Sequence, residues 1–203
     1  MNTLAAMNTL VDLGKMHSAA KSEALLNAYD ALFTDVRRSA WRVLEFGTGF
    51  GGSLLMWAEY FEYAKILGVD IEPLKIPDHP RVSVIQGLQE EFVPKHTFDV
   101  IIDDGAHTRV ETEAALQHCW SSLRSGGFYC IEDWGTGYWP SWSDGRAWKL
   151  GHQAGMVGLV KDFVDAAGAD DVRKENETGP GSFVVCHLAS LQVFPGLAVL
   201  RKS

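Results

Sequence analysis

Five short runs of β-branched and aliphatic residues, most of them separated by helical segments, constrain the fold of this chain more than any other feature. The runs are predicted strands and lie at Arg42–Phe46, Ile66–Val69, Val82–Ile85, Phe98–Ile102 and Phe128–Ile131. Helical patterns at Ser53–Glu62 and Thr112–Leu123 lie between them. Such alternation predicts a mostly parallel sheet with right-handed crossovers and helices on both faces.

The two ends of the chain differ from this alternation. Apolar residues recur at three- and four-residue spacing from Ser22 to Arg38, which predicts an amphipathic helix within an N-terminal helical segment, residues 1–40. Near the other end, Phe183–Leu188 and Val193–Leu200 are strand-like and joined by a link too short for a crossover helix, so we expect them to pair antiparallel. The expected fold is therefore α/β and Rossmann-like, with a mostly parallel seven-stranded sheet ending in an antiparallel hairpin. This is the outline expected of a class I methyltransferase, although a fold alone does not fix a function.

Length, composition and charge narrow the choice of domains and partners. A chain of 203 residues with 46% hydrophobic residues is long enough for one buried core and short for two, which predicts a single domain over residues 1–203. Within it, residues 134–155 carry tryptophans among glycines and polar side chains, and we expect a lid or loop beside the ligand site. The net charge of −8 disfavours nucleic acids and anionic membranes as partners and favours a small-molecule substrate.

Cysteine usage and the N-terminus bear on the compartment. Cys119, Cys130 and Cys186 are odd in number and widely spaced, which argues against a disulfide framework or a zinc site and favours a reducing cytoplasm. The segment Met1–Leu13 carries no basic residue and has no long apolar core, so it does not resemble a signal peptide. No apolar run approaches the ~20 residues that a membrane span needs. We therefore expect a cytoplasmic protein.

A glycine-rich segment follows the first predicted strand. It reads Glu45-Phe46-Gly47-Thr48-Gly49-Phe50-Gly51-Gly52 and precedes the helical run that begins near Ser53. Glycines let a backbone turn sharply and approach a nucleotide-like ligand, and a helix N-terminus presents free amide groups. The next strand ends in Asp70, whose carboxylate can accept hydrogen bonds from ribose hydroxyls. The pattern fits a dinucleotide enzyme equally, and a tight turn without a ligand stays an alternative.

Acidic residues follow two further predicted strands. Asp103 and Asp104 end one strand, with His107 three residues after Asp104, and Glu132 and Asp133 end the next. Ligand sites in open α/β sheets lie at the carboxyl ends of strands, and neighbouring strands are ~4.8 Å apart, so these side chains can converge. Oxygen ligands from Asp104, Glu132 and Asp133 would suit a hard divalent ion such as Mg²⁺. His107 is the candidate general base. Each acid taken singly could instead be a turn residue or a helix cap, whereas their joint placement favours a site.

These motifs resemble those of the Mg²⁺-dependent sugar O-methyltransferases of macrolide and related antibiotic biosynthesis, a family grouped with the cephamycin-pathway protein called cephalosporin hydroxylase. The Asp-Asp-Gly-Ser-His block of the family reads here Asp103-Asp104-Gly105-Ala106-His107. Its Ile-Glu-Asp and Tyr-Trp-Pro blocks match Ile131–Asp133 and Tyr138–Pro140, and the segment Leu44–Leu54 with the Met56-Trp57 pair is similar too. The resemblance covers nearly the whole chain.

The resemblance implies an S-adenosylmethionine-dependent O-methyltransferase in which Asp104, Glu132 and Asp133 bind Mg²⁺ and His107 is the general base. The residues expected to hold the methyl donor are Glu45, Gly47, Thr48, Gly49, Asp70, Ile71, Gln86, Gly87 and Asp103. The sequence departs from the family pattern at Ala106, where the family has serine, and at Leu88, where it usually has aspartate. The chain is also shorter than typical members.

Other functions stay open at this level. A metal-dependent methyltransferase acting on a phenol or catechol would use the same residues, and aromatic lid residues would serve a ring or a sugar face. An NAD-dependent oxidoreductase would explain the glycine-rich segment and Asp70 but would give the acidic cluster no role. A donor-binding protein without catalysis is the alternative outside the enzymes, and a homo-oligomer is open as well.

Overall fold

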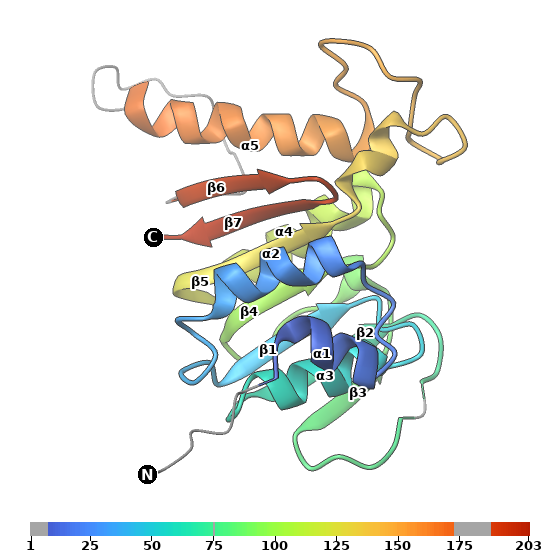
Figure 1. Cartoon of the computed structure of the whole chain (residues 1–203). Helices are drawn as coiled ribbons and strands as arrows, with labels where there is room; N and C mark the ends of the chain where they lie inside the picture. Colours follow the sequence, from blue (N-terminus) through green and yellow to red (C-terminus); the bar gives the residue numbers. More distant parts are fainter. Residues whose placement is uncertain (1–7, 75, 173–187) are drawn as a thin grey trace.

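The computed structural model of the chain describes residues 8–74, 76–172 and 188–203, and these contain one seven-stranded sheet (Figure 1). The strand order is β3-β2-β1-β4-β5-β7-β6. The first five strands in that order run parallel, whereas β7 runs antiparallel to both β5 and β6, which confirms the predicted sheet. The strands are β1 (Arg42–Phe46), β2 (Lys65–Asp70), β3 (Val82–Gln86), β4 (Phe98–Asp103), β5 (Leu123–Glu132), β6 (Leu188–Phe194) and β7 (Leu197–Lys202).

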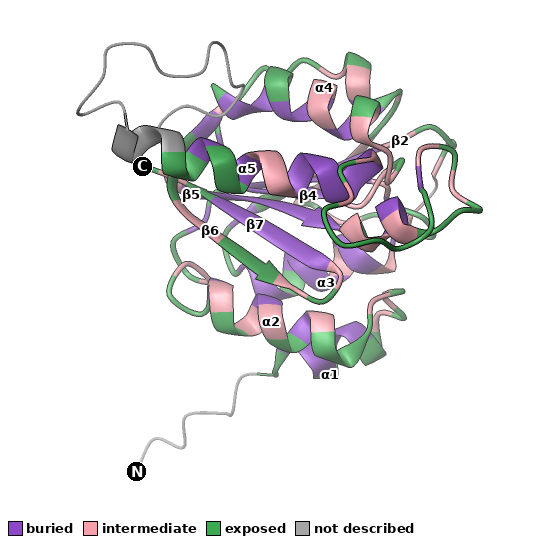
Figure 2. Cartoon of the chain, turned by 90° about the horizontal axis from the view of Figure 1, so that it is seen from above, coloured by how far each residue is buried: buried purple, intermediate pink, exposed green. Residues whose placement is uncertain are grey.

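Helices cover both faces of the sheet, as Figure 2 shows: α1, α2 and α3 lie on one face and α4 and α5 on the other. Two 3₁₀ helices, η1 and η2, lie in the loops. Thr9 and Asp12 form a capping box at the start of α1, and the Ser22 side chain caps α2, so both helices begin at residues that suit a helix N-terminus. The bounds are α1 (Leu10–Met16), α2 (Glu23–Phe33), α3 (Gly52–Tyr60), η1 (Gln89–Glu91), α4 (Arg109–Trp120), η2 (Trp134–Tyr138) and α5 (Gly155–Val172).

The C-terminal hairpin exists, but the predicted bounds of its strands are wrong. The turn joins Phe194 to Leu197 and falls inside the run Val193–Leu200, which we predicted to be one strand. Gly196 at this turn has a φ of +76°, a backbone conformation that glycine adopts without strain, so the chain reverses there. The other predicted run, Phe183–Leu188, lies outside the described residues except for Leu188, which begins β6.

The register of the parallel strands brings the expected site residues to one edge of the sheet. Asp103 of β4 is level with Phe46 of β1 on one side and with Ile131 of β5 on the other. The residues that follow, Asp104 and Glu132, therefore leave the sheet at the same height on neighbouring strands. This edge is the carboxyl end of the sheet, where open α/β folds bind ligands.

An aromatic cluster fixes α2 and α3 against the sheet below this edge. The Tyr29 ring stacks on Phe33 with centroids 5.2 Å apart and meets Trp57 edge-on at 5.4 Å, while Phe33 also contacts Phe61 and Phe128. The first four of these aromatic side chains are fully buried and Phe128 nearly so, and each large aromatic buries on the order of 150–250 Å². The cluster thus places the hydroxyl end of Tyr29 beneath the carboxyl end of the sheet.

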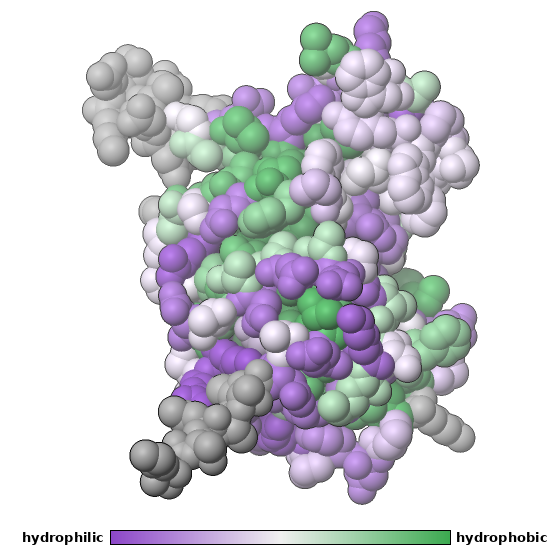
Figure 3. Space-filling view, viewed as in Figure 1, coloured by the Kyte–Doolittle hydropathy of each residue, from purple (hydrophilic) through white to green (hydrophobic). Residues whose placement is uncertain are grey.

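The outer surface differs from one element to the next. Hydrophilic side chains lie over α2, whereas apolar side chains gather near α5 and β6 (Figure 3), where Val164 and Val193 are about half exposed. Within the part of the chain that the structure describes, no helix has the length and apolar character that crossing a bilayer requires. Cys119 and Cys130 are buried free thiols, and Cys186 lies outside the described residues.

Candidate active site

An open cavity of about 660 Å³ lies at the carboxyl end of the sheet. It is lined by residues that the sequence analysis assigned to two different tasks, holding the donor and performing the chemistry. Those that line it are Gly47, Gly49, Asp70, Ile71, Gly87, Asp104, His107 and Asp133. Glu45, Thr48, Gln86, Asp103 and Glu132 are not among its lining residues, and the structure gives most of them protein partners instead.

Asp70 at the end of β2 holds the glycine-rich loop in shape. Its Oδ2 accepts hydrogen bonds from the Thr48 amide at 2.7 Å, the Thr48 hydroxyl at 3.1 Å and the Gly49 amide at 3.1 Å, and Oδ1 accepts from the Glu72 amide. Burial opposes ionisation, but these hydrogen bonds outweigh it and hold the pKa of Asp70 below its usual value. An ionised carboxylate therefore lies at the wall of the cavity.

Gly47 lies where the loop after β1 touches the chain after β4. Its φ is +74°, and a Cβ on this residue would lie 1.9 Å from the carbonyl oxygen of Asp104. The glycine-rich loop and the acidic strand end are thus in direct backbone contact, and only glycine fits there.

We expect Gly47→Ala to destabilise the protein by more than about 3 kcal/mol, because the methyl group would overlap the Asp104 carbonyl. Gly49→Ala is the matched control: its φ is +49°, but nothing lies within 4 Å of its Cβ position, so only about 1 kcal/mol of backbone strain is expected. Urea unfolding of both variants measures the difference. Equal losses would contradict the close contact between the loop and Asp104.

Asp104, His107 and Asp133 come together at the mouth of the cavity. The Nε2 atom of His107 is 3.7 Å from Asp104 Oδ1 and 3.9 Å from Asp133 Oδ2. One ligand atom from each of the three residues lies within 4.8 Å of the others. His107 and Asp133 both have φ near +50°, a conformation that costs a non-glycine residue on the order of 1 kcal/mol and is concentrated at functional sites.

A lysine that the sequence analysis did not identify lies under this cluster. The Nζ atom of Lys21 is 2.7 Å from Glu132 Oε1, 2.8 Å from Asp104 Oδ2 and 3.4 Å from Glu45 Oε1, and its side chain is only 2% exposed. Burial lowers the pKa of Lys21, but attraction to Glu132, Glu45 and Asp104 more than compensates and leaves it above the usual value. Lys21 directly precedes Ser22, the N-cap of α2.

Glu132 and Glu45, expected at the metal and at the donor, both contact Lys21. Glu132 Oε1 also accepts a hydrogen bond from the Tyr29 hydroxyl at 2.7 Å. The Glu45 carboxylate, fully buried, accepts from the Ser53 hydroxyl at 2.8 Å and the Trp57 indole at 3.2 Å. Burial raises the pKa of both carboxyl groups, and Lys21 opposes the rise. A contact of Glu45 with the donor stays a prediction.

Asp103 and Gln89 form a buried pair, and Gln89 is part of the cavity lining. Asp103 accepts hydrogen bonds from the Tyr129 hydroxyl at 2.9 Å and from Gln89 Nε2 at 3.2 Å, and burial raises its pKa to about 6. The other end of the Gln89 amide accepts from the backbone N–H of Ala106 at 2.7 Å. Gln89 thus shapes the loop before His107, a role that the sequence analysis did not assign to it.

The aromatic-rich segment, residues 134–155, borders the site. The Trp142 ring centroid is 6.1 Å from that of His107, and the Thr136 hydroxyl donates to the His107 carbonyl oxygen at 2.9 Å. Trp139 and Trp148 are more than half exposed. The Trp142 ring therefore lies near the candidate base.

The sheet order, the glycine-rich loop after β1 and the carboxylates that end β2, β4 and β5 together define a Rossmann-like methyltransferase domain. The family described as a methyltransferase domain matches residues 44–131. The sequence is also similar to antibiotic-sugar O-methyltransferases.

Two curated relatives illustrate that similarity. The 8-demethyl-8-(2-methoxy-alpha-L-rhamnosyl)-tetracenomycin-C 3'-O-methyltransferase of Streptomyces olivaceus is 34% identical over 86% of this chain and 48% of its own length. Mycinamicin VI 2''-O-methyltransferase of Micromonospora griseorubida is 33% identical over 86% of this chain and 47% of its own length. The chain thus spans about half the length of the curated relatives it matches.

Solved methyltransferase structures have the same fold as this chain. The MycE methyltransferase from the mycinamycin biosynthetic pathway, in complex with Mg, SAH and mycinamycin VI, superposes with a TM-score of 0.83 at 30% identity, covering 97% of this chain and 54% of MycE. A second MycE structure, with Mg and SAH, gives a TM-score of 0.82 over 96% of this chain.

Proposed function

We propose that this chain is a catalytic domain that transfers a methyl group from S-adenosylmethionine to a sugar hydroxyl of a small natural product, with Mg²⁺ and with His107 as the general base. One observation carries the proposal: a single cavity is lined by the glycine-rich loop and Asp70 on one side and by Asp104, His107 and Asp133 on the other. The named activities of the relatives, all O-methyltransferases, support it.

On the donor side, the loop from Gly47 to Gly49 and the ionised Asp70 would bind the nucleoside part of S-adenosylmethionine. The carboxylate suits ribose hydroxyls, and the glycines allow close approach of the backbone. Ile71, Gly87 and Leu88 line the same part of the cavity and supply apolar and backbone surface. Thr48, Gln86 and Asp103 would support this wall from behind.

On the acceptor side, the difficulty is the proton. A sugar hydroxyl has a pKa near that of water, ~15.7, against ~6.5 for a free imidazole, so complete proton transfer between two such groups before the reaction would cost about 12 kcal/mol. Mg²⁺ supplies positive charge that makes the hydroxyl more acidic. His107 would then accept the proton as the new carbon–oxygen bond forms and the carbon–sulfur bond of the donor breaks. The sulfonium leaving group needs little help beyond alignment.

The chemistry of the residues present fits a magnesium site. Asp104 and Asp133 offer carboxylate oxygens at the mouth of the cavity, and Glu132 lies on the neighbouring strand end, next to the ammonium that also binds Asp104. Magnesium prefers such oxygen ligands, whereas imidazole favours softer metals, which leaves His107 for proton transfer. The exposed rings of Trp139 and Trp148 could stack on a sugar face.

Calorimetry with S-adenosylmethionine and with NAD tests the assignment without knowledge of the acceptor. We expect S-adenosylmethionine to bind and NAD to bind far more weakly, because the donor loop and the carboxylate cluster line one cavity. Formation of S-adenosylhomocysteine with a panel of glycosylated and phenolic acceptors, in Mg²⁺, then separates sugar from phenol methylation. Binding of NAD without binding of S-adenosylmethionine would overturn the proposal.

The remaining expectations stay predictions. They are a cytoplasmic location, a single domain over residues 1–203, homo-oligomer formation and the lack of nucleic-acid partners.

A further inference from the structure

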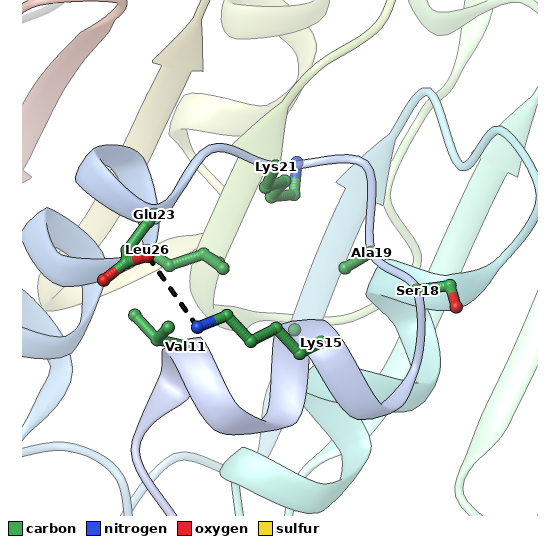
Figure 4. A pocket seen from close by; sticks show the side chains of 8 residues that line it. Val11, Lys15, Ser18, Ala19, Lys21, Glu23 and Leu26 are labelled. Atoms are coloured by element: carbon green, nitrogen blue, oxygen red, sulfur yellow. Dashed lines mark ion pairs between the residues drawn. The ribbon is translucent and has the colours of Figure 1, made fainter.

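Lys21 is the buried cation nearest to the proposed magnesium ligands. It lies on the segment that joins α1 to α2 (Figure 4), and its ammonium contacts Asp104 and Glu132 at hydrogen-bond distance and Glu45 slightly farther away. The tertiary structure thus brings this cation to carboxylates 83 and 111 positions away in the sequence.

One ammonium, that of Lys21, is shared by three carboxylates. Glu45 and Glu132 are buried almost completely and Asp104 is 24% exposed, so each ionised group loses much of its hydration. With all three carboxylates ionised, one ammonium leaves a formal charge of minus two, which is the charge that a divalent ion would neutralise. Lys21 therefore provides part of the compensation that the ion would complete.

Lys21 contacts one oxygen of each of two proposed ligand carboxylates, Asp104 and Glu132. It contacts Oδ2 of Asp104, whereas Oδ1 faces His107, and it shares Oε1 of Glu132 with the Tyr29 hydroxyl. Among the described residues, Lys21 and Tyr29 both donate their hydrogen bonds to Oε1 of Glu132. Lys21 thus holds one oxygen of Asp104 and one of Glu132, and the second oxygen of each carboxylate faces away from Lys21.

We propose that Lys21 is a positioning residue that acts as a built-in counter-cation for the divalent-ion site: it keeps Asp104 and Glu132 in place without the ion and weakens binding of the ion through like-charge repulsion. The inference rests on the proposed magnesium site. A neutral side chain in place of Lys21 is therefore expected to lower the stability of the protein without the ion and to raise its affinity for the ion.

The test compares Lys21→Met with Lys15→Met in the full chain. Lys15 and Lys21 both line a small cavity of about 210 Å³, but the Lys15 side chain is 70% exposed and pairs with the exposed Glu23 (Figure 4). Without metal, Lys21→Met is expected to melt about 10 °C lower than the wild type, because it leaves buried carboxylates uncompensated. Lys15→Met is expected to stay within about 1 °C.

Calorimetric titration with Mg²⁺ provides the second measurement. Lys21→Met is expected to bind Mg²⁺ at least about tenfold more tightly than the wild type, and Mg²⁺ should recover most of its lost melting temperature. A merely structural role would lower the affinity or leave it unchanged. Equal or weaker Mg²⁺ binding by Lys21→Met, with normal binding by the wild type, would overturn the inference. No Mg²⁺ binding by the wild type would instead refute the proposed magnesium site.

A double variant covers the case in which Lys21→Met does not fold. Adding Glu132→Gln removes a negative charge next to the missing ammonium. The melting temperature of the double variant should therefore be closer to that of the wild type than the melting temperature of Lys21→Met. If the double variant were as unstable as the single one, uncompensated charge would not be the cause and the counter-cation role would be refuted.

Discussion

Replacing His107 with alanine is expected to lower the rate of methyl transfer by roughly two to four powers of ten, the usual contribution of a general base. The His107 ring lies between Asp104 and Asp133 at the mouth of the cavity, where an acceptor hydroxyl would be held. Donor affinity should change little, because the hydrogen bonds that shape the donor loop come from Thr48, Gly49 and Asp70. Single-turnover rates and calorimetry with S-adenosylmethionine measure the two quantities separately.

His17 provides the matched control for this experiment. Its imidazole pairs with Glu59 at 2.8 Å on the surface, and it is not one of the described residues that line the large cavity. His17→Ala should therefore keep turnover within about twofold of the wild type. Near-normal turnover of His107→Ala would show that another group accepts the proton, and a large loss in His17→Ala would indicate that group.

Asp104→Asn is expected to lower both Mg²⁺ affinity and turnover, each by at least about tenfold, because it removes a charged ligand and a partner of Lys21. The variant differs in this respect from His107→Ala, which should leave metal affinity largely intact. Higher Mg²⁺ concentrations should restore part of the activity of Asp104→Asn. Chelation of the wild type should abolish transfer, and full activity after exhaustive chelation would rule the metal out.

Asp99 provides a carboxylate control near the start of β4, the strand whose other end precedes Asp104. It accepts hydrogen bonds from the Trp41 and Arg42 amides and pairs with Arg124 at 3.1 Å, far from the carboxyl edge of the sheet. Asp99→Asn should cost some stability and leave Mg²⁺ affinity unchanged. A similar loss of Mg²⁺ affinity in both aspartate variants would mean that general destabilisation, rather than loss of a ligand, explains the Asp104 result.

Features with a local physical cause could be read from the sequence. The run Arg42–Phe46 forms β1 with the predicted bounds, because an aliphatic strand followed by glycines has few alternatives. The parallel order then places the ends of β2, β4 and β5 at one edge, so the convergence of Asp70 and Asp104 follows from topology and strand spacing alone. His107 enters the same cavity because it is only three residues beyond Asp104.

The tertiary structure alone decided which groups neutralise the acids at that edge. The sequence analysis assigned no role to Lys21, whereas the structure buries its side chain beside that of Glu45 and joins the two in one charge cluster. The structure also holds Glu132 through Tyr29. The burial cost of a charge depends on every group within a few ångströms, including groups about a hundred residues away in the chain, so no local pattern of residues encodes it.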